Sequence, residues 1–207
     1  LNNRVAIISA LTSNGKLIKD LDLYWTQVLY YMNLKSLGRT HSRISQEIKA
    51  TLENMKRFTE SYPELSFISD GFYVRNTEFT SRQNSAQIKH LLIKADEATQ
   101  ISESQPNIWK VESQMDLVQA TNMISVGIDI ERWNVLMMVG QPLTTAEYIQ
   151  ASSRSGRRHK GLVVNLYNPI RARELSYYEN YTSYHQVFYK FVEPLSATTF
   201  TEMTLDK

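Results

Sequence analysis

Residues 116–139 read DLVQATNMISVGIDIERWNVLMMV, in which two apolar runs are separated by a mixed segment with one glycine. The runs 116–120 and 134–139 have the length and apolar content of strands that are buried on both faces. A third run of this kind, 161–167 (GLVVNLY), follows a short helical pattern at 144–153. Alternating strands and helices favour an α/β domain with a mainly parallel sheet between helices.

The same alternation extends toward the amino terminus. Residues 27–32 (QVLYYM) predict a strand, 33–36 a polar loop and 42–61 a long helix. We expect another strand within 65–74, and 77–82 lead into an amphipathic helix at 86–95. Residues 96–114 are polar and contain Pro106, which indicates a connection between regular units.

Length and composition predict a single core. With 207 residues, of which 42% are apolar and 21% charged, the chain fits one domain better than two. We expect residues 1–24 to be a lead-in or interdomain connection, 25–168 to form the α/β domain and 169–207 a helical extension. The last helix, at about 174–192, is crowded with aromatic residues. We expect these to pack on the domain, and base stacking on a single strand is the alternative.

Several classes of protein are disfavoured. Because the chain has no cysteine, it can form neither disulfides nor thiolate metal sites, and its four histidines lack ligand spacing, so we expect no metal site. With neither a bilayer-length apolar run nor a clear signal peptide, we expect no membrane contact and a cytoplasmic protein. The net charge of +2 does not identify a nucleic-acid binder. Since the chain begins at Leu1, we treat it as part of a longer protein.

Residues 150–157, QASSRSGR, place two arginines in a loop of small residues between a predicted helix and a strand. Guanidinium groups are planar, permanently charged and matched to phosphate oxygens, so Arg154 and Arg157 suit charge stabilisation in phosphoryl transfer. The alternative is a solvated basic turn, because Arg158, His159 and Lys160 extend the charged run.

Residues 120–130, ATNMISVGIDI, follow a predicted strand. Hydroxyl and amide groups are thereby placed at a strand's carboxyl end, where open α/β sheets bind ligands. Gly127 allows a ligand to approach the backbone closely, and Asp129 can accept a hydrogen bond from a ribose hydroxyl. The alternative is a turn in which Asp129 caps a helix.

Taken together, these stretches resemble motifs V and VI of superfamily 2 helicases, A-T-x-x-x-x-G-x-D and Q-x-x-G-R-x-G-R. Residues 30–38 (YYMNLKSLG) resemble motif IV, and residues 78–82 (EFTSR) resemble motif IVa. Ser153 departs from the broad pattern, which has glycine there, but residues 140–150 (GQPLTTAEYIQ) resemble a narrower branch, the large helicases of bacterial DISARM antiphage systems and their relatives. The resemblance extends from about residue 25 through the tail and implies a RecA-like C-terminal lobe.

The resemblance also implies a role for individual residues. Arg154 and Arg157 are expected to act as arginine fingers at the γ-phosphate, Gln150 to line the nucleotide site, and Gly127 and Asp129 to face the nucleotide sugar and the partner lobe. The residues expected toward the nucleic-acid backbone are Asn33, Ser36, Thr80, Ser81, Arg82, Thr121 and Asn122. For Asn33 and Ser36, an ordinary loop-capping pair is the alternative.

The sequence lacks the other half of an ATP site. No G-x-x-x-x-G-K-[ST] is present, and 14–17 (NGKL) lacks its first glycine and its hydroxyl residue. We therefore expect ATP and Mg²⁺ only in a full-length protein, with Mg²⁺ held by an N-terminal RecA-like lobe of the same chain and single-stranded nucleic acid, DNA rather than RNA, as the partner. The alternative function is a non-catalytic nucleic-acid-binding or scaffold module with the same fold.

Overall fold

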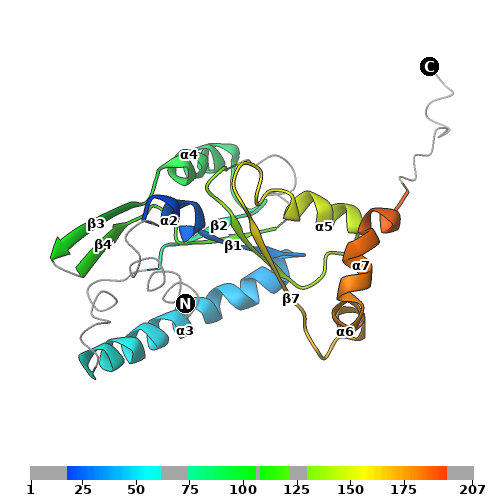
Figure 1. The fold of residues 1–207 in the computed structure, drawn as a ribbon, viewed down its shortest axis with the longest axis horizontal. Helices are drawn as coiled ribbons and strands as arrows, with labels where there is room; N and C mark the ends of the chain where they lie inside the picture. Colours follow the sequence, from blue (N-terminus) through cyan, green and yellow to red (C-terminus); the bar gives the residue numbers. More distant parts are fainter. Residues whose placement is uncertain (1–17, 62–73, 106–107, 122–129, 195–207) are drawn as a thin grey trace, which may run out of the picture.

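The computed structural model describes residues 18–61, 74–105, 108–121 and 130–194. In chain order the elements are α2 (Ile18–Trp25), β1 (Gln27–Tyr31), α3 (Leu34–Ser61), β2 (Asn76–Phe79), α4 (Ser85–Asp96), β3 (Gln100–Gln105), β4 (Ile108–Glu112), β5 (Leu117–Ala120), β6 (Val135–Val139), α5 (Thr145–Ser152), β7 (Leu162–Leu166), α6 (Ala172–Glu179), α7 (Tyr181–Val187) and the 3₁₀-helix η2 (Phe188–Phe191). Five strands form a parallel sheet in the order β2-β5-β1-β6-β7 (Figure 1). The prediction of an α/β domain with a mainly parallel sheet is confirmed.

Helices cover both faces of the sheet. In Figure 1, α3 runs along one face, and α2, α4 and α5 lie on the other. Leu29 and Tyr31 of β1 pack with Leu37 of α3, whereas Val28 and Tyr30 belong to the core on the side of α4 and α5. Successive strand residues point to opposite faces, so the unbroken apolar run of β1 supplies both cores.

Helix α3 begins earlier than the sequence predicted. Residues 33–36 were expected to form a loop before a helix starting at 42, but α3 starts at Leu34. The Ser36 amide donates to Asn33 Oδ1 at 2.8 Å, and the Leu37 amide donates to the Asn33 carbonyl at 3.2 Å. Asn33 thus acts as an N-cap, which satisfies amides that have no partner within the helix. The capping alternative for Asn33 describes this geometry.

Three strands were missed because the segments that contain them are mostly polar. Residues 77–82 were expected only to lead into a helix, but Asn76–Phe79 form β2 at the edge of the sheet, paired with β5. The strand predicted within 65–74 lies almost wholly outside the described residues. The interpretation of 96–114 as a connection is wrong, because β3 and β4 pair there as an antiparallel ribbon. Backbone hydrogen bonds between strands form whatever the polarity of the side chains, so composition concealed this ribbon.

The C-terminal helix expected at 174–192 is interrupted. Asn180 has φ −102° and ψ 19°, outside the helical region, and separates α6 from α7. Its backbone and side-chain N–H groups both donate to the Ser176 carbonyl, at 3.0 and 2.9 Å. Asparagine is suited to this break because its side chain competes with the helix for backbone partners.

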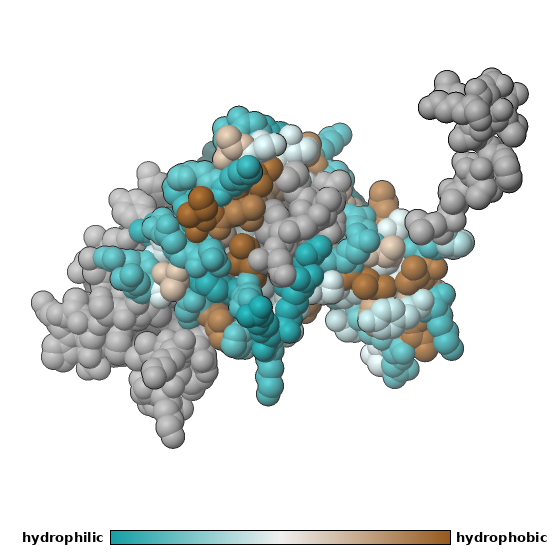
Figure 2. Space-filling view, turned by 90° about the horizontal axis from the view of Figure 1, so that it is seen from above, coloured by the Kyte–Doolittle hydropathy of each residue, from teal (hydrophilic) through white to brown (hydrophobic). Residues whose placement is uncertain are grey.

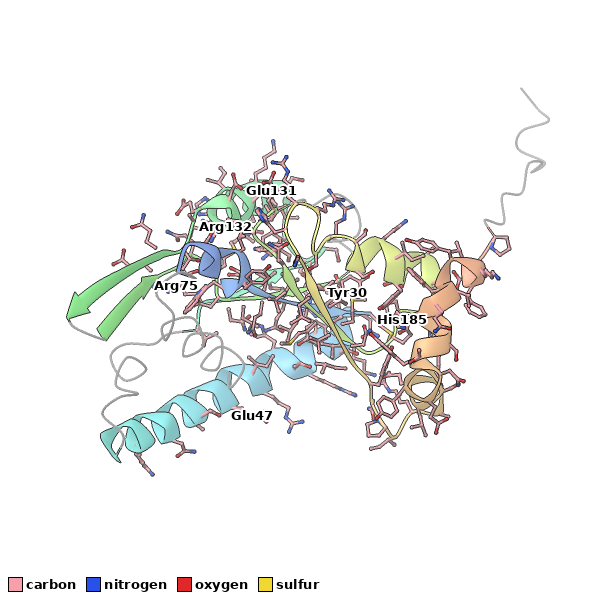
Figure 3. The ribbon with its side chains drawn as sticks, viewed as in Figure 1. Tyr30, Glu47, Arg75, Glu131, Arg132 and His185 are labelled. Carbon is pink, nitrogen blue, oxygen red and sulfur yellow. The ribbon has the colours of Figure 1, made fainter. Side chains whose placement is uncertain are left out.

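Residues 18–24, which lie within the expected lead-in, form most of α2, and Asp22 of this helix joins it to the lobe. Asp22 forms an ion pair with Arg132, whose side chain is only 12% exposed. Arg132 also donates to the Ala95 carbonyl at 3.2 Å and to Thr99 Oγ1 at 3.0 Å. Figure 3 shows Arg132 on the side of the sheet covered by α4. With two hydrogen bonds to the Asp22 carboxylate and one each to Ala95 and Thr99, all four bonds of the guanidinium favour a structural role for this arginine.

Among the helices of the described ranges, none combines the length and the apolar character that a bilayer crossing requires.

Candidate functional site

The carboxyl edge of the sheet gathers several of the residues expected to contact nucleic acid. In a parallel sheet, the residues that follow the strands share one edge, and β2, β5 and β1 are neighbours. Thr80 follows β2, Thr121 follows β5 and Asn33 lies just after β1, so they come together although they are far apart in sequence. The Thr121 amide donates to the Phe79 carbonyl at 3.4 Å.

These residues differ in what they offer a ligand. Thr80 is fully buried, and its hydroxyl donates to Glu78 Oε1 at 2.6 Å. The Gln83 amide donates to the Thr80 carbonyl at 3.2 Å, so Thr80 shapes the turn that carries Ser81 and Arg82. Both of those residues are exposed. The exposed groups after β2 are therefore the Ser81 hydroxyl and the Arg82 guanidinium, and Asn33 is exposed after β1, on the other side of β5.

Asn122, Gly127 and Asp129 lie outside the described residues. The described residues on either side, Thr121 and Ile130, leave the carboxyl end of β5 and lead to the amino end of β6.

The loop of residues 153–161, here called the arginine loop, connects α5 to β7 at the opposite, amino edge of the sheet. Gln150 is exposed on α5, Arg154 is half-buried and Arg157 is exposed. The Arg154 amide donates to the Ala151 carbonyl at 3.2 Å, so a tight turn of the chain continues past the end of α5. The structure thus brings Gln150 and the two arginines to one end of the lobe.

Two glycines allow the arginine loop to close on itself. Gly156 has φ +81°, and a Cβ there would lie 2.9 Å from the Gly161 nitrogen. A Cβ on Gly161 would lie 2.6 Å from the Gly156 nitrogen. Side chains essentially never approach a backbone this closely, and left-handed φ disfavours residues with a Cβ. The glycine of R-S-G-R is therefore required by backbone geometry.

The rest of the basic run is partly neutralised on the surface. Arg158 lies 2.7 Å from Glu131, with the two side chains 70% and 47% exposed. Arg157 Nε donates to the Ser153 carbonyl at 3.4 Å. Exposed ion pairs add little stability, so Arg158 is a solvated charge beside the two candidate arginines.

The arginine loop and the carboxyl-edge residues form two separate faces. The carboxyl-edge residues follow the ends of β1, β2 and β5, whereas the arginine loop precedes β7 and lies beside the start of β6. Within the described residues, no group of three or more histidine, aspartate or glutamate side chains is arranged to hold a metal ion.

Comparison with known proteins connects this geometry to a family. Residues 71–159 match the model of the helicase conserved C-terminal domain. The chain is 36% identical over 197 residues to the DISARM protein DrmA of Bacillus paralicheniformis, a match that covers 95% of this chain and 16% of DrmA. The chain carries a helicase conserved C-terminal domain.

The fold of this helicase lobe is similar to that of solved ATPase lobes. The crystal structure of the C-terminal part of the Fun30 ATPase domain aligns with a TM-score of 0.51 and 12% identity, over 96% of this chain and 50% of that one. Domain 2 of the Mss116p DEAD-box helicase, bound to an RNA duplex, aligns with a TM-score of 0.46 and 15% identity, over 79% of this chain and 49% of that one. The lobe is RecA-like, and the expected resemblance to superfamily 2 helicases and their DISARM branch is confirmed.

Sequence reasoning missed the side chains that attach the C-terminal extension to the helicase lobe. Arg173 of α6 donates to the carbonyls of Gln141, Pro142 and Leu143, the loop between β6 and α5. Glu193 accepts from the Thr145 amide at 2.8 Å, at the first turn of α5. These partners are far apart in the chain, so nothing in the sequence pattern pointed to them.

Aromatic packing completes the attachment. The hydroxyl of Tyr148 in α5 forms a hydrogen bond with His185 Nε2 at 2.8 Å. It also accepts a hydrogen bond from Asn165 Nδ2 at 3.1 Å. Burial raises the pKa of the Tyr148 and Tyr184 hydroxyls, so both remain neutral. In Figure 2, apolar side chains remain visible on the extension, which includes the exposed Ile170 and Phe191. The lobe therefore covers the extension only in part, and the hydrogen bonds of Arg173 and Glu193 contribute to holding the extension on the lobe.

Acidification is expected to break the hydrogen bonds between the Glu193 carboxylate and the first turn of α5. The Thr145 amide lowers the pKa of this carboxyl below its ordinary value of 4.5. A lowered folded pKa means that the contact stabilises fully above that ordinary value and is lost as pH falls through the folded pKa. In NMR titrations, the Thr145 and Ala146 amide shifts should therefore move below pH 4.5. Glu193→Gln should abolish this titration, whereas Glu179→Gln, on the exposed side of α6, should leave it intact. Titration that persists in Glu193→Gln would exclude Glu193 as its source.

Proposed function

We propose that this chain is the second motor lobe of an ATP-dependent nucleic-acid helicase or translocase, to which it supplies Arg154 and Arg157 as arginine fingers. The observation that carries this proposal is the arginine loop. Its backbone is closed by two glycines in contact, and it carries two arginines at one end of the sheet, of which Arg157 is exposed and Arg154 half-buried. A charge-stabilising group is effective when it is already in place before the transition state forms.

The donors at this end of the lobe fit the phosphates of a nucleotide held elsewhere. Guanidinium groups match phosphoryl oxygens in shape and charge, and Gln150 adds an amide beside them. The sequence lacks a P-loop, so we assign the β-phosphate and Mg²⁺ to an N-terminal RecA-like lobe. ATP supplies the phosphoryl group whose transfer the two arginines would stabilise, while Gly127 and Asp129 would face the nucleotide sugar.

The carboxyl edge is proposed as the nucleic-acid track. Ser81 and Arg82 are exposed after β2 and Asn33 after β1, with β5 between these two strands. Thr80 and Thr121 follow β2 and β5, Ser36 lies in the first turn of α3, and we include Asn122 in the proposed track as the residue after Thr121 in the sequence. Small polar groups and main-chain amides grip the phosphate backbone without reading base sequence. We propose single-stranded DNA as the partner. Because track and arginine loop lie at opposite edges of one rigid sheet, closure on ATP would move the track as a unit.

A nucleic-acid-binding scaffold is the second candidate, and the exposed track residues favour it equally. The two candidates differ at the arginine loop, since a scaffold needs no preorganised guanidinium groups at the other edge of the sheet. ATP turnover by the two-lobe protein therefore decides between them.

The purified chain is expected to show no nucleic-acid-stimulated ATP hydrolysis and weak binding to single strands. Binding to phosphates should weaken steeply between 50 and 200 mM salt, by roughly tenfold for every two to three phosphates contacted. Fluorescence anisotropy with two single strands of unrelated sequence at fixed salt measures this. Ser81→Ala combined with Arg82→Ala should reduce affinity for both strands alike. Turnover of ATP by the chain that Arg154→Ala abolishes, or a strong preference for one base sequence, would contradict the proposal.

A further inference from the structure

Asn134 uses its side chain and its main chain to join the arginine loop to the body of the lobe. It is 1% exposed and stands immediately before β6. Three groups of the loop and its exit donate to it. Ser155 Oγ donates to the Asn134 carbonyl at 2.9 Å, the Gly156 amide to Asn134 Oδ1 at 3.2 Å, and the Leu162 amide to the Asn134 carbonyl at 2.7 Å.

The nitrogen of the Asn134 side-chain amide is also held by hydrogen bonds. Asn134 Nδ2 donates to the Leu23 carbonyl at 3.2 Å and to the Glu131 carbonyl at 2.9 Å. Its backbone amide also donates to the Leu23 carbonyl, at 3.3 Å. Because both donors of the side-chain amide face carbonyl oxygens, Oδ1 must point toward Gly156. No other side chain of this size offers two donors and an acceptor in this arrangement.

These bonds bear directly on the two arginines. Ser155 and Gly156 lie between Arg154 and Arg157, so each arginine is next to an anchored residue. The side chain of an arginine is long and flexible, so the region that its guanidinium can reach depends first on where its backbone is held. Fixing the backbone on both sides of the pair reduces the reorganisation needed when a phosphoryl group is transferred.

We propose that Asn134 is a positioning residue for Arg154 and Arg157, and that the Ser155 hydroxyl is the tether through which this can be tested. The inference rests on the proposed arginine-finger function and adds the residue on which the placement of the fingers depends. Asn134 touches neither nucleotide nor nucleic acid in this scheme; it acts through the arginine loop alone.

The test uses the intact two-lobe protein and a double-mutant cycle between Ser155→Ala and Arg157→Ala. Ser155 is only half-buried, so Ser155→Ala removes one hydrogen bond with little risk to folding. Loss of a single bond of this type is expected to lower kcat for ATP about 5- to 20-fold, with the KM for ATP and single-strand affinity unchanged. Ser155→Thr keeps the hydroxyl and should restore most of kcat.

The second arm of the cycle separates positioning from simple stability. In the Arg157→Ala background, Ser155→Ala should lower kcat by a clearly smaller factor, because only one of the two arginines that it positions remains. Ser153→Ala is the matched control, since the Ser153 hydroxyl donates to the Gln150 carbonyl within the turn and not to Asn134; its kcat should stay near normal. Asn134→Asp, which loses both amide donors, should reproduce the kcat loss of Ser155→Ala with a larger fall in Tm.

Other results of this experiment would contradict either the positioning inference alone or the arginine-finger function as well. If Arg157→Ala cripples hydrolysis but Ser155→Ala lowers kcat equally in both backgrounds, or lowers only Tm, Asn134 is structural and the positioning inference fails while the proposed function stands. If Arg157→Ala leaves hydrolysis near normal, the arginine-finger function fails, and the positioning inference fails with it.

Discussion

Arg157→Ala in the intact two-lobe protein is expected to reduce nucleic-acid-stimulated ATP hydrolysis by on the order of 10³-fold or more. We expect this because the guanidinium would meet charge that grows on the phosphoryl group during transfer, so its loss falls on rate more than on binding. The fold and most single-strand affinity should survive, since Arg157 is exposed and lies at the end of the sheet opposite the proposed nucleic-acid track. Steady-state kinetics with saturating single strand provide the measurement.

Two further variants define the chemistry of that result. Arg157→Lys should rescue poorly, because an ammonium group lacks the planar fork that matches phosphoryl oxygens. Arg158→Ala is the matched control: the residue is adjacent, it is an arginine, and its pairing with Glu131 lies on the surface. Near-normal hydrolysis in Arg157→Ala, or equal damage in Arg158→Ala, would replace the arginine-finger reading with a solvated basic turn.

Gly156→Ala is expected to lower ATP hydrolysis by roughly 10²-fold without removing any catalytic side chain. The added Cβ would lie 2.9 Å from the Gly161 nitrogen, a backbone atom that can move away only if the loop itself shifts. Left-handed φ, here +81°, adds a cost of about 1–2 kcal/mol for a residue with a Cβ. The loop must therefore open, and both arginines shift with it.

Gly38→Ala serves as the control for this substitution. A Cβ on Gly38 meets nothing within 4 Å, and the residue lies inside α3. Alanine should therefore stabilise the protein by about 0.5–1 kcal/mol. Thermal unfolding of both variants, measured beside their hydrolysis rates, separates the two effects. Equal changes in stability for Gly156→Ala and Gly38→Ala would show that the strain at Gly156 is unimportant.

The sequence by itself determined the fold class and most of the sheet. The apolar runs that became β1, β5 and β6 are largely buried, and burial on both faces leaves a continuous hydrophobic signal that needs no knowledge of neighbours. The edge strand β7 carries the same apolar signal, although Leu162 and Leu166 at its two ends are exposed. The sequence motif also contained the glycine of R-S-G-R, Gly156, but it did not reveal the left-handed φ and the close contact with Gly161 that require a glycine there. Motif order carried the resemblance to helicases, which the comparisons then confirmed.

The tertiary structure alone decided which residues meet. Polar strands such as β2 and the β3-β4 ribbon give no hydrophobic pattern, because their stability comes from backbone pairing with partners elsewhere in the chain. The same holds for Asn134, which is separated from Gly156 by β6, α5 and the start of the arginine loop, yet donates to and accepts from three segments at once. Hydrogen bonds between distant residues depend on the fold having formed, so no local pattern could identify Asn134 as the anchor of the arginine loop.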